Sequence, residues 1–266
     1  MNTFLLLALT GAFAGTLGGL FGIGGGIVIV PALYVVFTAA GAEPDLAMKT
    51  AVGTSLATII VTSLRSVRAH RRRGAVDFGV LVSWAPFIAG GSVLGALAAR
   101  VVSGDMLLVL FACGVIAIGI QRVRGGAGLP GKMSFSPLVQ RLLALGTGFF
   151  SALMGIGGGV IGVLLLSASG RTIHQAVGTA SGFGMAIAIP GALGFVLVGL
   201  GQGSIAGAIG FVHIPAFLSV ALGTLIFAPA GASLAHRLSP GRLSTVFGIY
   251  LLVTGVLLLR EAILAA

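Results

Sequence analysis

The feature of this sequence that most constrains its fold is a series of ten long apolar runs separated by short polar breaks. The runs span residues 4–21, 23–40, 46–64, 78–99, 106–120, 138–154, 156–168, 176–200, 205–235 and 243–259. A helix that crosses the hydrocarbon core of a bilayer takes about 20 residues and satisfies its own backbone hydrogen bonds. The runs therefore predict an all-α polytopic membrane protein with about eight to ten membrane elements.

The composition excludes the main classes of water-soluble protein. Hydrophobic residues make up 57% of the chain and charged residues only 8%, whereas a soluble domain carries about 25% charged residues. The 45 glycines lie among Leu, Ile, Val, Ala and Phe without a collagen period. Such mixing is typical of closely packed membrane helices. We therefore exclude a cytosolic enzyme, a disordered chain and a coiled coil.

The net charge of +10 comes mainly from two basic clusters in the breaks between apolar runs. The clusters contain Arg65, Arg68, Arg71, Arg72 and Arg73, and then Arg122, Arg124, Lys132 and Arg141. This pattern is typical of cytoplasmic loops under the positive-inside rule. It favours the lipid bilayer as the partner of the chain over nucleic acid. Contact of the clusters with anionic lipid or another protein is the alternative.

The two halves of the chain resemble each other in sequence. The segment GTLGGLFGIGGG at 15–26 corresponds to GFFSALMGIGGG at 148–159, and AVGT at 51–54 returns at 176–179. Farther on, Trp84-Ala85-Pro86 corresponds to His213-Ile214-Pro215. This order indicates an internal duplication, as in many transporters. We predict a first transmembrane repeat at 1–121, a cytoplasmic linker at 122–137 and a second repeat at 138–266.

The distribution of charge favours inverted repeats. If each Gly-Ile-Gly-Gly-Gly run lies at the bend of a helical hairpin, each half holds three full spans and the halves have opposite topology. Twelve basic residues then lie on the cytoplasmic side and three outside, against ten and five if each glycine-rich element is one broken spanning helix. In the second half both arms of the hairpin are short for a span, whereas in the first half both are long enough.

The glycine runs are the strongest candidates for a substrate site. Consecutive glycines disfavour a continuous helix and allow another molecule to approach the main chain. The N–H groups of a half-helix that starts there favour an anion. The candidate residues are Gly22, Gly24, Gly25 and Gly26, with Gly155, Gly157, Gly158 and Gly159 as their counterparts. The alternative is that these glycines only allow close helix crossing.

Hydroxyl groups and one histidine complete the candidate site. Thr54 and Ser55 follow the first glycine run, and Thr179 and Ser181 follow the second. Their hydroxyls are able to donate hydrogen bonds to oxyanion oxygens, or to bond to their own helices. His213 has a pKa near neutrality in its ordinary state, and either assists an anion or proton or makes a structural hydrogen bond.

The sequence lacks the groups that other mechanisms need. All five acidic residues lie near the ends of apolar runs, so a carboxylate relay of the kind used by many symporters is not expected. There is one cysteine, Cys113, and no HExxH motif. We therefore expect no enzyme, no metal site and no cofactor. The membrane potential, about 2.3 kcal/mol per charge per 100 mV, favours outward movement of an anion without ion coupling.

The duplicated GxxxxLxGIGGG element, the AVGTS sequence at 51–55 and the His70-Arg71-Arg72-Arg73-Gly74 loop resemble the sulfite exporter TauE/SafE family of bacterial membrane permeases. The resemblance covers nearly the whole chain. It implies a multi-pass inner-membrane protein that moves sulfite, sulfonates or related anions, often outward. It assigns the substrate site to the glycine runs with Thr54, Ser55 and Thr179. The second half departs from the pattern, because Ala180-Ser181 stands where the first half has Ser55-Leu56. An anion channel, a permease for another anion such as a carboxylate, and an intramembrane enzyme are the alternatives.

Overall fold

The computed structural model describes residues 3–21, 25–124, 136–235 and 240–265, which form ten helices and one short hairpin. The elements are α1 (Thr3–Phe21), α2 (Gly26–Ala39), α3 (Pro44–Arg72), α4 (Phe78–Ala98), α5 (Gly104–Val123), α6 (Pro137–Leu153), α7 (Gly159–Ala168), α8 (Ile173–Gly199), β1 (Ala208–Ile209), β2 (Val212–His213), α9 (Ile214–Ala235) and α10 (Pro240–Ala265). Within the described residues, α3, α4, α5, α8 and α10 are long and apolar enough to cross a membrane. This architecture confirms the prediction of an all-α polytopic membrane protein.

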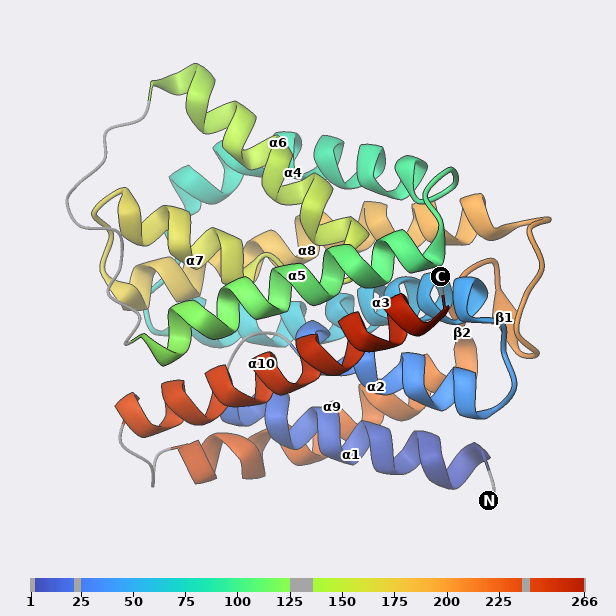
Figure 1. The fold of residues 1–266 in the computed structure, drawn as a ribbon. Coiled ribbons are helices and arrows are strands. Elements are labelled where there is room, and N and C mark those ends of the chain that lie inside the picture. The colour runs from blue at the N-terminus through green and yellow to red at the C-terminus, as the bar shows by residue number, and fades with distance from the viewer. Residues whose placement is uncertain (1–2, 22–24, 125–135, 236–239, 266) are drawn as a thin grey trace.

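The two halves contain the same series of five helices, so that α1 to α5 correspond to α6 to α10 (Figure 1). Each helix runs in the opposite direction from its counterpart. For example, α5 runs from the right-hand end of the view to the left, whereas α10 runs from left to right.

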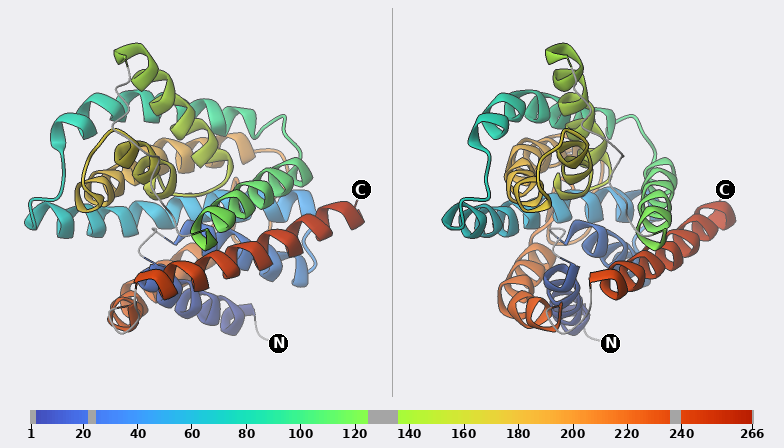
Figure 2. Two further views of the ribbon diagram at one scale, coloured as in Figure 1. Left: turned by 60° about the vertical axis from the view of Figure 1, so that its left-hand side comes forward. Right: turned by 90° about the vertical axis from the view of Figure 1, so that its left-hand side faces the viewer.

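Helices of one half pack against helices of the other half. The first-half helix α1 lies along α9, and the second-half helix α6 lies along α4, while α3 packs on α8 and α5 on α10 (Figures 1 and 2). A methyl group on Gly15 would lie 2.5 Å from the carbonyl oxygen of Gly223, and one on Gly148 would lie 2.0 Å from that of Ile88. The glycine that opens each duplicated segment therefore serves close helix packing.

Each half begins with a helical hairpin whose second arm is short. Helix α2 has 14 residues and α7 has 10, so they are about 21 Å and 15 Å long. Both are shorter than a hydrocarbon core of about 30 Å. The expectation that both arms of the first hairpin are long enough to span is therefore wrong for α2. The reason is that this helix starts only at Gly26, after Gly25 takes a left-handed conformation with φ of 77°.

A glycine also ends the first arm of the second hairpin. Gly155 follows α6 with φ of 63°, and the N–H of Ile156 donates to the carbonyl of Ser151 at 3.0 Å. This is the hydrogen-bond pattern of a Schellman motif, in which a residue in the left-handed region stops the helix. The break predicted from the glycine run is therefore present in the second half.

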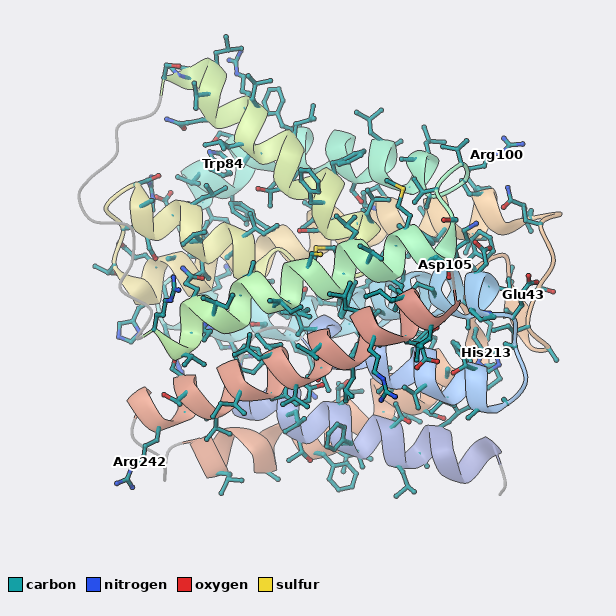
Figure 3. All side chains as sticks on the ribbon, in the orientation of Figure 1. Glu43, Trp84, Arg100, Asp105, His213 and Arg242 are labelled. Atoms are coloured by element: carbon teal, nitrogen blue, oxygen red, sulfur yellow. The ribbon has the colours of Figure 1, made fainter. Side chains whose placement is uncertain are left out.

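The segment before α9 differs from the sequence-based expectation. The apolar run at 205–235 predicts one continuous element, but its first part forms the hairpin of β1 and β2, and the helix begins at Ile214. Gly207 and Gly210 have positive φ in this hairpin. The correspondence of Trp84 with His213 is also wrong. Trp84 lies inside α4, whereas His213 precedes α9 at the other end of the molecule (Figure 3).

Basic residues are concentrated at one end of the molecule. The end at the left of Figures 1 and 3 holds the last turns of α3 and α5 and the first turns of α6, α8 and α10. These segments carry ten of the described basic residues, namely Arg65, Arg68, Arg71, Arg72, Arg73, Arg122, Arg124, Arg141, Arg171 and Arg242. The described basic residues at the opposite end are Lys49, Arg100 and Arg260.

Candidate functional site

The two glycine-rich segments meet in the interior of the protein. A methyl group on Gly26, the first residue of α2, would lie 2.7 Å from the carbonyl oxygen of Gly155 and 3.0 Å from Cα of Ile156. A methyl group on Gly155 would lie 3.0 Å from Cα of Val52 in α3. Segments more than a hundred residues apart are thus in main-chain contact here, and glycine is required because no side chain fits between them.

The N-terminal ends of α2 and α7 approach this junction from opposite directions (Figure 1). In α7 the N–H of Gly162 donates to the carbonyl of Gly158 at 2.8 Å. The N–H groups of the three residues before Gly162 therefore have no acceptor within the helix. In α2 the carbonyl of Gly25 is the first acceptor of the helix and accepts from the N–H groups of Val28 and Ile29. Two helix ends with partial positive charge meet at one place, which favours an anion.

Side chains of α3 hold the junction together. The hydroxyl of Ser55, which is completely buried, donates to the carbonyl of Gly155 at 2.7 Å. The side chain of Ile59 lies 3.0 Å from the position of a methyl group on Gly26 and 3.5 Å from that of one on Gly157. Ser55 therefore fixes the second glycine turn, and Ile59 contacts both turns.

The remaining predicted glycines have different surroundings. Gly22 and Gly24 lie outside the described residues. A methyl group on Gly158 would lie 2.6 Å from Cβ of Phe183 in α8, so this glycine also serves packing. Gly159 follows Gly158 in the chain and is the first residue of α7.

The AVGT sequence has a structural role that is the same in both halves. In the first half, a methyl group on Gly53 would lie 2.2 Å from the carbonyl oxygen of Phe211, and the hydroxyl oxygen of Thr54 accepts from the N–H of His213 at 2.9 Å. We call this contact the α9 docking point because His213 immediately precedes α9. The two residues of α3 thus hold the main chain that leads into a helix of the opposite half.

The second half repeats this arrangement. A methyl group on Gly178 would lie 2.3 Å from the carbonyl oxygen of Ala75, and the hydroxyl oxygen of Thr179 accepts from the N–H of Asp77 at 2.9 Å. Asp77 immediately precedes α4, so this contact is the α4 docking point. The structural counterpart of His213 is therefore Asp77.

The side chains of His213 and Asp77 cap their helices in the same way. Nδ1 of His213 accepts from the N–H of Ala216 at 3.1 Å, and Oδ1 of Asp77 accepts from the N–H of Val80 at 3.1 Å. Because Nδ1 accepts, Nε2 carries the proton and donates to the carbonyl of Ala206 at 3.0 Å. Burial lowers the pKa of His213, and its hydrogen bond to Ala206 opposes this shift. His213 thus serves as a neutral helix cap.

Asp77 makes one contact that His213 does not. Its Oδ2 accepts from Nε of Arg171 at 3.1 Å, in a half-exposed ion pair between the halves. The backbone N–H of Val80, and then Arg171, lower the pKa of Asp77 from its ordinary value, while burial partly opposes them.

The other residues of interest lie along α3 and α8. Ser181 donates to the carbonyl of Gly178 at 2.6 Å, within its own helix. Lys49 is not among the candidate site residues predicted from the sequence. The side chain of Lys49 is 8% exposed and pairs with Asp45 one turn earlier. The signal for this pair was the i, i+4 spacing of opposite charges at the start of an apolar run.

Comparison with known proteins identifies the family. The profile of the family described as "Sulfite exporter TauE/SafE" matches residues 7–258. A protein of Haemophilus influenzae named "Probable membrane transporter protein" is 32% identical over 96% of this chain and 98% of its own length. A relative of the same description in Methanocaldococcus jannaschii is 27% identical over 96% of this chain and 94% of its own. No solved structure matches the chain. The chain is therefore a multi-pass membrane transporter and belongs to the sulfite exporter TauE/SafE family.

Proposed function

We propose that this transporter moves small sulfur-containing oxyanions, such as sulfite or organosulfonates, out of the cell across a bacterial inner membrane. The family description supports this substrate class. The observation that carries the proposal is the meeting of the N-terminal ends of α2 and α7 beside Ser55. Discontinuous helices of transporters bind anionic groups through such ends.

The acidic residues support an anion over a cation. None of the five acidic residues is buried, because Glu43, Asp105 and Glu261 are exposed and Asp45 and Asp77 are half-buried. An anion in the interior therefore meets N–H groups without a buried carboxylate that would repel it. Such a neutral site lets the membrane potential drive export, by about 2.3 kcal/mol per charge per 100 mV.

We further propose that the halves are inverted repeats in the bilayer. Counterpart helices run in opposite directions in Figure 1, and the basic residues are concentrated at one end of the molecule. By the positive-inside rule that end faces the cytoplasm. The repeats then comprise residues 1–121 and 138–266, with a cytoplasmic linker at 122–137. Labelling of the Arg100→Cys variant at that cysteine only from the cytoplasmic side would contradict this orientation.

The proposal is tested by transport in proteoliposomes with the protein and with Gly157→Ala. A methyl group on Gly157 meets only Ile59, at the ordinary contact distance of 3.5 Å, so the fold should tolerate it. Because the methyl group lies beside the start of α7, we expect sulfite efflux to fall about tenfold, the equivalent of about 1.4 kcal/mol. Gly146→Ala is the matched control, since a methyl group there has nothing within 4 Å.

The wild-type measurement separates the alternatives. We expect saturable sulfite flux that methanesulfonate inhibits and acetate does not. A non-saturating conductance would identify a channel, and equal competition by acetate would identify a permease for carboxylates. Normal flux in Gly157→Ala with an unchanged melting temperature would remove the glycine junction as the substrate site.

A further inference from the structure

The first turns of α3 contain a buried positive charge that the glycine junction does not use. Of the lysines and arginines that the structure describes, only Lys49 is buried. Its Nζ lies 3.0 Å from Oδ2 of Asp45 and 5.9 Å from the ring centroid of Phe211. An ionisable residue within a membrane segment is costly and commonly marks the path of a substrate or ion. Lys49 therefore calls for a functional explanation.

The duplicated framework does not require a charge at this position. Ala51 corresponds to Ala176, so the counterpart of Lys49 is His174, which is exposed at the start of α8. Both docking points form although only one half has a buried lysine. The docking points thus do not need a buried lysine, and Lys49 is specific to the first half.

Thr50, the residue that follows Lys49 in the chain, has a polar group without a partner among the described residues. The hydroxyl of Thr50 is completely buried and makes no hydrogen bond among the described residues. A buried hydroxyl without a partner costs about 1–3 kcal/mol. Thr50 lies one turn before Thr54, and these two residues share a face of α3. A ligand oxygen at this face would satisfy the hydroxyl.

The carboxylate of Asp45 has a second hydrogen-bond partner besides Lys49. Its Oδ1 accepts from the N–H of Gly104 at the start of α5, so the side chain keeps a partner without the lysine. The Asp45 side chain is 42% exposed and that of Lys49 only 8%. The carboxylate therefore neutralises the buried ammonium from its solvent side, as a bound anion would.

We propose that Lys49 and the hydroxyl of Thr50 form a second contact for the transported oxyanion, and that Asp45 replaces the anion on Lys49 when the anion leaves. This inference rests on the proposed function. Lys49 lies six residues before Ser55, about 9 Å along α3 toward the sparsely charged end. An anion moving outward from the glycine junction meets this contact next, and the competing carboxylate prevents the buried ammonium from trapping it.

The test compares the effects of Lys49→Gln and Asp45→Asn on binding of sulfite and methanesulfonate to the purified protein, by titration calorimetry. If the carboxylate competes with the anion, Asp45→Asn tightens binding several-fold and Lys49→Gln weakens it about tenfold. The asparagine oxygen still accepts from Gly104, so the start of α5 is preserved. Thr50→Val, which keeps the side-chain shape, should also weaken binding several-fold, whereas Arg100→Gln removes an exposed charge at the same end and should have no effect.

The outcomes distinguish this contact from the glycine junction. A purely structural ion pair predicts that Asp45→Asn and Lys49→Gln change binding in the same direction, which would overturn the inference while leaving the proposed function intact. If the wild-type protein binds neither anion, the proposed function and the second contact both fail. If Lys49→Gln does not fold, Lys49→Arg, which retains the charge, takes its place. In that case unchanged binding in Asp45→Asn would overturn the inference.

Discussion

The two docking points share one backbone arrangement but differ in the side chain at its centre. At each, a glycine gives room to a carbonyl, a threonine accepts a backbone N–H, and a side chain caps the next helix. The cap is His213 before α9 and Asp77 before α4, and only Asp77 has an ion-pair partner, Arg171. The duplication thus preserves main-chain contacts, while the charge at each end has diverged.

This difference follows the charge of the two ends. Asp77 and Arg171 lie at the arginine-rich end, where an acidic cap is stabilised by nearby positive charge. His213 is the last residue of the hairpin at the other end and is buried, and an uncharged cap there avoids the cost of desolvating a carboxylate. We infer that the glycine and threonine of AVGT are needed for the fold, and that the capping residue adapts to its surroundings.

Replacement of the two docking-point glycines by alanine is expected to cause the largest loss of stability. In Gly53→Ala and Gly178→Ala the new methyl group would lie within 2.3 Å of a carbonyl oxygen of the opposite half, and neither main chain is free to move. We expect each variant to lose about 3 kcal/mol of stability, measured by denaturant unfolding in detergent. Gly90→Ala in α4 is the control, because a methyl group there has nothing within 4 Å. If Gly53→Ala lost stability and Gly178→Ala did not, the two docking points would not be equivalent.

Removing the threonine hydroxyls should separate the two points. Thr54→Val leaves the N–H of His213 without an acceptor in a buried contact, at a cost of about 1–3 kcal/mol. The contact of Thr179 with Asp77 is only partly buried, so water replaces the hydroxyl and Thr179→Val should cost less. The same unfolding measurement gives both values, with Thr→Ser at each position as the control that keeps the oxygen. A greater loss for Thr179→Val would contradict the difference in burial.

The main features of the fold could be predicted from the sequence because they depend on local patterns. The apolar runs predicted about eight to ten membrane elements, and each of the ten described helices falls on one of these runs. The Gly-Ile-Gly-Gly-Gly runs predicted the break that Gly155 makes after α6. The hairpin before α9 was missed because its residues are also apolar. The closely spaced glycines at 201, 203, 207 and 210, all with positive φ, were the available signal.

The partners of the candidate side chains could not be predicted in this way. The hydroxyls of Thr54 and Thr179 contact main-chain atoms 159 and 102 residues away, and the carbonyl that accepts from Ser55 is 100 residues away. A hydroxyl next to a glycine run looks the same in sequence whether it binds a substrate or the opposite half. The burial of Lys49 likewise depends on the ring of Phe211 in a distant segment.

The smallest effect, and the most specific to the two caps, is their pH dependence. The pKa of His213 is lowered from 6.5 by burial, so the folded state favours the neutral ring. The stability it contributes is complete above pH 6.5 and is lost as the pH falls below that value. Protonation also places a hydrogen on Nδ1, which then no longer accepts from Ala216. The pKa of Asp77 is lowered from 3.8, so its contribution is lost only as the pH falls below 3.8.

Between pH 7 and pH 5 the α9 docking point should therefore weaken while the α4 docking point does not change. We expect the melting temperature of the wild-type protein to fall over this range. In His213→Asn the amide oxygen still caps α9 but does not titrate, so the fall should be smaller. Asp77→Asn is the matched control and should lower the melting temperature by a similar amount at pH 7 and pH 5. If Asp77→Asn removes the pH dependence and His213→Asn keeps it, the acidic cap and not the histidine controls this transition.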